Sequence, residues 1–169
     1  TLNSPSLLKV ENLVMHFEIR SGLFSGISGY VHAVDDISFE LKKSQTVSLV
    51  GESGCGKTTT GRSILKLEEH TSGNIYLNGK NLVEMGGDEL RKLRSDMQMI
   101  FQDPFSSLNP RMTIGEAVAE PMLIHNLYRG KELEEKVADL LIRVGISPTN
   151  TSRYPHEFSG GQRQRICIA

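Results

Sequence analysis

The sequence has few cysteines, no long apolar run and almost no net charge. Each of these three features excludes a class of protein. Its two cysteines have a spacing that suggests neither a metal site nor a disulfide framework. No apolar stretch approaches the ~20 residues that a bilayer-spanning helix needs. A formal charge of −1 gives no electrostatic basis for binding nucleic acid or an anionic membrane surface. A cytosolic, reducing setting fits this composition best.

The N-terminal residues resemble no targeting signal. Residues 1–6 read TLNSPS and contain neither the basic nor the apolar region of a signal peptide. They also lack an initiating methionine, which suggests that the chain is trimmed at this end. The remaining composition, 38% hydrophobic and 23% charged, is that of an ordinary globular domain. A chain of 169 residues is long enough for one such domain, burying roughly two-thirds of its unfolded surface.

The order of apolar patterns along the chain predicts strands first and helices later. Imperfect alternation predicts a strand at 7–19, a Gly/Ser-rich loop at 21–30 and a second strand at 31–41. Further strands are predicted at 46–50, 73–79 and 97–101, and helices at 57–67, 88–95, 113–126, 130–144 and 160–169. Thr113 is a suitable N-cap, and Pro121 is expected to kink or interrupt its helix. The whole is an α/β arrangement with a helical insertion.

One short segment carries a phosphate-binding pattern. Residues 51–58 read GESGCGKT, which matches G-x-x-x-x-G-K-[ST], between a predicted strand and a predicted helix. Its glycines allow the backbone N–H groups to approach phosphate, Lys57 supplies a charge to the β- and γ-phosphates, and Thr58 offers a hydroxyl to Mg²⁺. Cys55 is expected to be a small filler rather than a nucleophile. The nucleotide-binding residues predicted here are Gly51, Ser53, Gly54, Cys55, Gly56, Lys57, Thr58 and Thr59.

A second segment predicts another anion site. Residues 158–165 read FSGGQRQR, and Ser159 with Gln162 has the spacing of a capping box, so a helix is expected to begin there. Gly160 and Gly161 leave backbone N–H groups without side chains at the positive end of that helix. From the residues alone, a plain helix start after a glycine turn is the alternative.

Residues 158–162 resemble the Leu-Ser-Gly-Gly-Gln signature of ABC ATPases, with Phe158 in place of leucine. The resemblance implies that Ser159, Gly160, Gly161 and Gln162 bind the γ-phosphate of ATP held in the P-loop of a second, identical or homologous ATPase subunit, in a head-to-tail dimer. It also implies the fold: α/β, with a partial P-loop NTPase core, an antiparallel β subdomain and a helical subdomain.

The same resemblance divides the chain into three parts. Residues 1–87 are predicted to hold the β subdomain and the P-loop part of the core. The Q-loop and helical subdomain are predicted at 88–158, and the signature with the start of its helix at 159–169.

Two further positions acquire roles from this resemblance. Residues 99–104 are similar to the Q-loop, in which Gln102 would approach Mg²⁺ and the attacking water. From the residues alone, the favoured interpretation of Gln102 is a turn residue before Asp-Pro. An aromatic side chain near the end of the first strand is expected to stack on adenine. Phe17 fits that position by its distance from the strand start, and Tyr30 is the alternative. A buried core role for Phe17 is also open.

Residues 101–113 read FQDPFSSLNPRMT and resemble the oligopeptide and dipeptide importer branch of the family, as do 154–157 and 163–169. The resemblance covers about residues 7–169. It implies a peripheral ATPase subunit at the cytoplasmic face of the membrane, which powers uptake of peptides, or of glutathione or nickel. Its implied partners are permease subunits, which dock on about 88–158, and indirectly an extracytoplasmic binding protein; nucleic acid is not among them.

Hydrolysis needs residues that the chain does not show. No run of four apolar residues after the P-loop ends in an acid, and in the family the Walker B Asp, catalytic Glu and switch His follow the signature, whereas this chain ends at Ala169. We therefore expect the 169 residues alone to hydrolyse no ATP and to bind it weakly, with one strand edge unpaired. A different P-loop enzyme such as a kinase, or a non-transport ABC protein of DNA repair or translation, are the alternatives.

Overall fold

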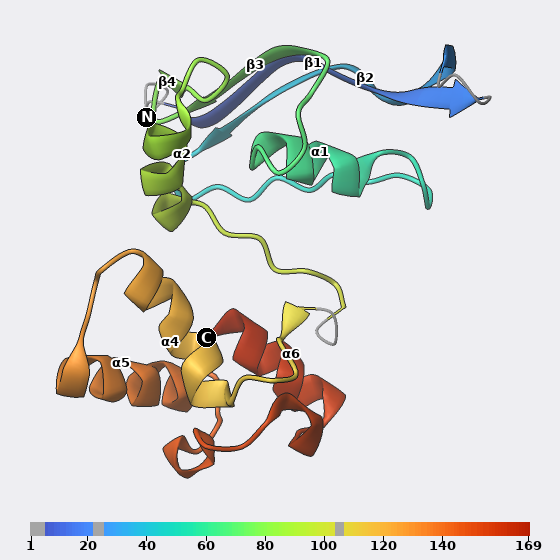
Figure 1. The fold of residues 1–169 in the computed structure, drawn as a ribbon. Helices are drawn as coiled ribbons and strands as arrows, with labels where there is room; N and C mark the ends of the chain where they lie inside the picture. Colours follow the sequence, from blue (N-terminus) through green and yellow to red (C-terminus); the bar gives the residue numbers. More distant parts are fainter. Residues whose placement is uncertain (1–5, 22–25, 104–106) are drawn as a thin grey trace. The chain divides into compact units, whose positions relative to one another are not determined.

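The computed structural model describes residues 6–21, 26–103 and 107–169 (Figure 1). It forms two compact units, Thr1–Met97 and Gln98–Ala169, which are described separately below. Part of the predicted loop at 21–30 and part of the predicted importer segment at 101–113, including the end of the Q-loop segment, lie outside the described residues. The three-part division drawn from the sequence stays a prediction.

An antiparallel sheet organises the first unit. Its strands are β1 (Ser6–Ser21), β2 (Gly26–Lys42), β3 (Ser72–Leu77) and β4 (Lys80–Asn81), in the order β2-β1-β3-β4. The predicted strands at 7–19, 31–41 and 73–79 are confirmed. The predicted loop is wrong over 26–30, because pairing with β1 continues through Ile19↔Gly29 to Ser21↔Gly26 and outweighs the low strand propensity of glycine and serine.

One face of this sheet carries the core of the first unit. The buried residues of that core are Val10, Leu13, Met15, Val34, Ile75, Leu77 and Leu82. Helix α1 (Lys57–Ile64) contributes Ile64 to the edge of this core, and α2 (Gly87–Leu93) is followed by the 3-10 turn η1 (Arg94–Asp96). Helix α1 ends before the predicted residue 67, because Lys66 has a left-handed backbone (φ 51°) that stops the helix.

Two predicted strands are absent from the structure. Residues 46–50 and 97–101 have apolar, strand-like sequences but form neither strand nor helix. A strand requires a neighbour that satisfies its backbone N–H and C=O groups, and the four described strands pair only with one another. Consequently most of their apolar side chains are exposed, above all Val50 at 92% and Ile100 at 58%, whereas Met97 and Met99 are half-buried. The apolar pattern of these segments is typical of strands, but it does not indicate whether a neighbouring strand is available for pairing.

The second unit is helical. It consists of α4 (Ile114–Ile124), α5 (Gly130–Arg143), α6 (Gly160–Ile168) and the 3-10 turns η2 (Pro148–Asn150) and η3 (Pro155–Glu157), close to prediction. Thr113 caps α4 in a reciprocal box with Glu116, as expected. Pro121 does not interrupt α4, since the buried Val118 and Met122 on either side of it pack into the core of this unit. Among the described helices, none has both the length and the apolar character required to cross a bilayer.

Candidate functional site

The loop before α1 depends on glycine at Gly56. This residue has a left-handed backbone (φ 88°), and a Cβ built on it would lie 2.1 Å from the backbone oxygen of Ala33 on β2. A side chain there would be both strained and in collision with backbone, so only glycine fits. Gly54 is also left-handed (φ 83°), although a Cβ on it would meet open space. The loop is therefore shaped by its own glycines and by direct contact with β2.

The N-terminus of α1 is left open to an anion. Its N-cap, Gly56, has no side chain to accept from the first N–H groups, and no acidic residue lies in the first turn. The N–H of Thr60 reaches the carbonyl of Gly56 at 2.8 Å, which closes the first turn of the helix. The preceding N–H groups of this turn have no carbonyl within the helix to bond to. Together with the helix dipole, they favour a bound phosphate.

Lys57 lies across this loop. Its ammonium donates to the backbone oxygens of Gly51 (2.9 Å) and Glu52 (2.6 Å) and lies 3.5 Å from Cys55 Sγ. An ammonium group has three donors. Two of them hold the charge in place on carbonyl oxygens, and the third points to Cys55 Sγ, a weak acceptor that a phosphate oxygen could replace. A positive charge fixed beside an open helix N-terminus suits the phosphates of a nucleotide, and the residues present therefore fit that group.

The other predicted residues of the loop differ in exposure. Ser53, Cys55 and Thr58 are exposed and Thr59 is half-buried, so the Thr58 hydroxyl is accessible at the first turn of α1. Thr60 was missed by sequence reasoning. It is buried, and its hydroxyl donates to the carbonyl of Gly56 at 3.0 Å, which fixes the last residue of the loop. The sequence did contain a signal for this contact, because Thr60 follows Gly56 by four residues, the spacing at which a helical threonine hydroxyl can reach a backbone carbonyl.

The remaining predicted positions are also exposed. Phe17 on β1 is 40% exposed, which rules out a buried core role, and pairs with Val31. Tyr30 on β2 is 53% exposed and pairs with Glu18, so the strand alternation directs Phe17 and Tyr30 to opposite faces of the hairpin. Gln102 is exposed and lies in an irregular segment at the start of the second unit.

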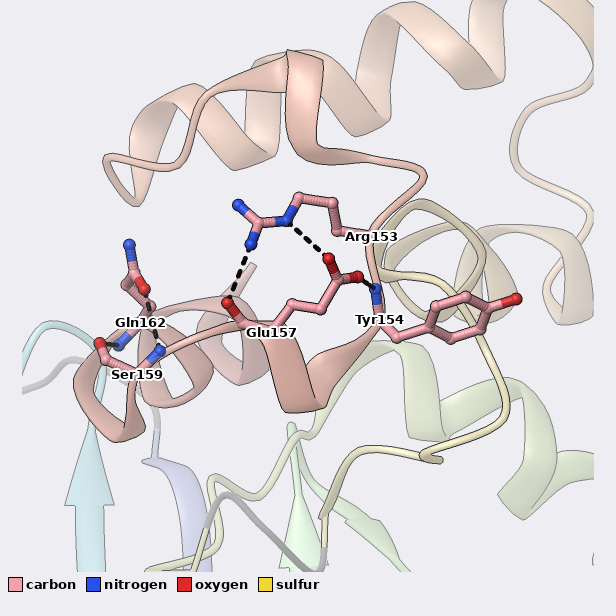
Figure 2. A network of polar contacts seen from close by, with 5 residues as sticks. All are labelled: Arg153, Tyr154, Glu157, Ser159 and Gln162. Carbon is pink, nitrogen blue, oxygen red and sulfur yellow. Dashed lines mark hydrogen bonds and ion pairs between the residues drawn. The ribbon is translucent and has the colours of Figure 1, made fainter.

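The predicted helix start at Ser159 is present in the second unit, where it forms an exposed tip (Figure 2). The Ser159 hydroxyl accepts from the N–H of Gln162 at 3.3 Å, and the Gln162 side chain accepts from the N–H of Ser159 at 3.0 Å. A Cβ built on Gly160 or Gly161 would meet nothing within 4 Å. The first turn of α6 is therefore bare and open, and its glycines are not required by packing within the chain.

The residues before Ser159 hold this tip in position (Figure 2). Glu157 accepts from the N–H of Tyr154 at 2.7 Å and from Arg153 Nε at 3.2 Å, while Arg153 also donates to the carbonyl of Glu157 at 3.1 Å. Phe158 is only 4% exposed, packs in the core of the second unit and has Arg153 over its ring at 5.0 Å. Phenylalanine in this position thus anchors the turn that presents Ser159.

Glu157 gives a pH-dependent prediction. The N–H of Tyr154, and next the side chain of Arg153, lower the pKa of Glu157 below its ordinary value of 4.5. A lowered pKa in the folded state stabilises the fold above 4.5, and this contribution is lost as pH falls through the folded-state value. We expect Glu157→Gln to reduce the acid-induced drop in melting temperature below that pH. Melting curves measured across the acid range test this. The same drop in melting temperature in the parent protein and in Glu157→Gln would show that the contacts of Glu157 with Tyr154 and Arg153 do not stabilise the fold.

A sequence model of the family described as ABC transporter matches residues 34–169. Among curated proteins, the chain is 54% identical over 163 residues to the glutathione import ATP-binding protein GsiA of Pectobacterium atrosepticum, and 53% identical to GsiA of Escherichia coli K12. Each alignment covers 96% of this chain and 26% of the relative. The chain therefore spans about a quarter of the length of the curated relatives it matches.

Solved structures show the same fold. The dimeric ATP-binding cassette MJ0796 bound to ADP and phosphate superposes with a TM-score of 0.80 at 27% identity, covering 95% of this chain and 67% of that one. CbiO1 of Clostridium perfringens, described as part of an ABC transporter complex, has a TM-score of 0.72 at 25% identity, covering 96% and 59%. The predicted fold class, a partial P-loop NTPase core with β and helical parts, is confirmed by these similarities.

Proposed function

The chain belongs to the ABC transporter family, and from that premise we propose that it is part of the ATP-binding subunit of an importer that couples ATP binding and hydrolysis to uptake. One observation supports the proposal: the chain has two exposed helix N-termini preceded or begun by glycines, at the loop of Gly56 and Lys57 and at the tip of Ser159, and each would suit an anion. A kinase would require only the loop at Gly56 and Lys57. Two such sites are what a nucleotide bound between two subunits requires.

The loop would hold the nucleotide of its own subunit. The uncapped N–H groups of α1 and the Lys57 ammonium would bind the β- and γ-phosphates, and the exposed Thr58 hydroxyl would be a ligand of Mg²⁺. The remaining residues of this site are Gly51, Ser53, Gly54, Cys55, Gly56 and Thr59. Mg²⁺ would supply charge neutralisation at the phosphates.

The tip would act on the nucleotide of a neighbour. Ser159, Gly160, Gly161 and Gln162 are assigned to the γ-phosphate of ATP in the P-loop of a second, identical or homologous subunit. The open space around both glycines supports this assignment, since a phosphate can approach the N–H groups closely only where no side chain intervenes.

Two more roles belong to the same proposal. The exposed Gln102 would approach Mg²⁺ and the attacking water, and the exposed ring of Phe17 would stack on adenine, with Tyr30 as the alternative. The 169 residues by themselves are proposed to be hydrolytically inactive, because no run of four apolar residues after the P-loop ends in the acidic residue that Mg²⁺ and water require. The division at 1–87, 88–158 and 159–169 is likewise proposed.

The transported compound is proposed by similarity. The relatives are named as glutathione import proteins, and the segment at 101–113 resembles peptide importers, so the cargo class is a peptide, with glutathione the leading member and nickel the alternative. The subunit would lie at the cytoplasmic face of the membrane and dock on permease subunits through the helical part. An extracytoplasmic binding protein would be an indirect partner, and the cargo itself would be handled by these other subunits.

Cross-linking of the full-length protein tests the two-site arrangement. Cys55 is an exposed native thiol in the loop, and Ser159→Cys would place a second thiol at the tip. We expect ATP to increase the yield of a product in which a short bifunctional thiol reagent joins Cys55 to the thiol introduced at position 159, identified by mass spectrometry of the linked peptides. The unsubstituted protein is the control, since it retains Cys55 and Cys167. A yield that ATP does not raise would count against the proposal.

A further inference from the structure

Three side chains outside the nucleotide site converge on the β1–β2 hairpin. His16 and His32 are paired across the two strands, with ring centroids 3.9 Å apart. The Asp35 carboxylate lies between them, with Oδ1 3.0 Å from His16 Nε2 and Oδ2 3.4 Å from His32 Nδ1. One ligand atom from each of the three residues lies within 4.8 Å of the others. None of these three residues is among those assigned above to the nucleotide sites.

A bulge in β2 brings these residues to one face. His16 pairs with His32 and Met15 pairs with Val34, so Ala33 is an extra residue on β2. In a regular strand, residues three apart point to opposite faces of the sheet. Because Ala33 is an extra residue between them, the side chains of His32 and Asp35 lie on the same face. That face is opposite to the buried Met15 and Val34. The cluster is thus produced by a specific backbone feature.

We propose that His16, His32 and Asp35 form a binding site for a divalent transition-metal ion of the Zn²⁺ class. Two imidazoles and a carboxylate are a donor set suited to zinc and its neighbours rather than to Mg²⁺ or Ca²⁺. Metal–ligand distances of about 2.0–2.1 Å in a tetrahedron place ligand atoms about 3.3 Å apart. The two observed separations, 3.0 Å to Asp35 Oδ1 and 3.4 Å to Asp35 Oδ2, involve different carboxylate oxygens. One ligand atom from each residue lies within 4.8 Å of the other two, so small side-chain rotations would bring the three to the tetrahedral spacing.

The surroundings of the cluster support ligation. The backbone N–H of His16 donates to Thr71 Oγ1 at 2.8 Å, which fixes the strand that carries this ligand, and the His16 side chain is only 22% exposed. His32 and Asp35 are more exposed, at 57% and 68%, which leaves room for water to complete four-coordination. The site also lies beside the loop of the nucleotide site, because Ala33, the bulged residue, is the one whose carbonyl contacts Gly56.

Zinc binding to the full-length protein, purified without a histidine tag, tests this inference. We expect saturable, micromolar binding of one Zn²⁺ to this site, measured by competition with a chromophoric chelator, and a visible absorption band when Co²⁺ replaces Zn²⁺. His16→Ala and His32→Ala should each weaken binding about tenfold or more, the size of loss that follows even from disturbing a metal ligand's surroundings. His32→Ala is the safer variant, since His32 is exposed.

His156→Ala is the matched control, because His156 is an exposed histidine outside the cluster, stacked on Tyr154. It should leave zinc affinity unchanged. Absence of saturable binding, or binding that neither cluster variant weakens, would show that Asp35 only hydrogen-bonds the two histidines and would overturn the inference. The readout does not depend on ATP, so this result is independent of the proposed function.

Discussion

Replacing Lys57 by alanine is expected to lower the ATPase activity of the full-length protein by about 100-fold or more, the usual cost of removing one fixed donor from a developing negative charge. ATP binding should weaken as well. The ammonium is held by the carbonyls of Gly51 and Glu52, so its charge is already in place before phosphate arrives. Alanine would leave the phosphates with the backbone N–H groups of the loop and of the first turn of α1.

Lys57→Arg is expected to lower the ATPase activity almost as much as Lys57→Ala. A guanidinium is planar and longer, and cannot make the same two carbonyl contacts from this position. Lys92→Ala is the matched control, since Lys92 is an exposed lysine on α2 with no role in the site, and its ATPase rate should be unchanged. Phosphate release and nucleotide titration measure the two effects. An active Lys57→Ala protein that melts normally would remove Lys57 from the proposed site.

Local chemistry made two local structures predictable from the sequence, the glycine-rich loop before α1 and the capped start of α6. The capping box at Ser159 depends only on residues three apart, and the loop at 51–58 depends on glycines, a lysine and the following helix. Both therefore appear in the structure where the pattern placed them. The same holds for the Thr113 cap of α4. Short-range hydrogen bonds specify these features with little help from the rest of the fold.

Features that need a distant partner were not predictable. The apolar segments at 46–50 and 97–101 have strand composition but no described strand beside them. The contact between Gly56 and Ala33 joins residues far apart in sequence, and nothing in either residue announces it. The cluster of His16, His32 and Asp35 depends on a register shift that no periodicity in β2 reveals.

Replacing Gly161 by alanine is expected to separate folding from function. Alanine in a helix is favoured over glycine by about 0.5–1 kcal/mol, and a Cβ at Gly161 would meet nothing within 4 Å in the chain. The variant should therefore melt no lower than the parent protein. ATPase activity should nevertheless fall about tenfold or more, because displacement of a bound phosphate by an added methyl group misplaces the reacting atoms.

A loss of ATPase activity in Gly161→Ala would have to come from contact with another molecule. Since the chain has room for the methyl group, an activity defect would mean that another molecule comes within contact distance of Gly161, as a nucleotide in a neighbouring subunit would. Gly87→Ala is the matched control: Gly87 begins α2, and a Cβ there would also meet open space. It should be both stable and active. A Gly161→Ala protein with full activity would mean that nothing approaches the tip, leaving only the Lys57 loop as a nucleotide site.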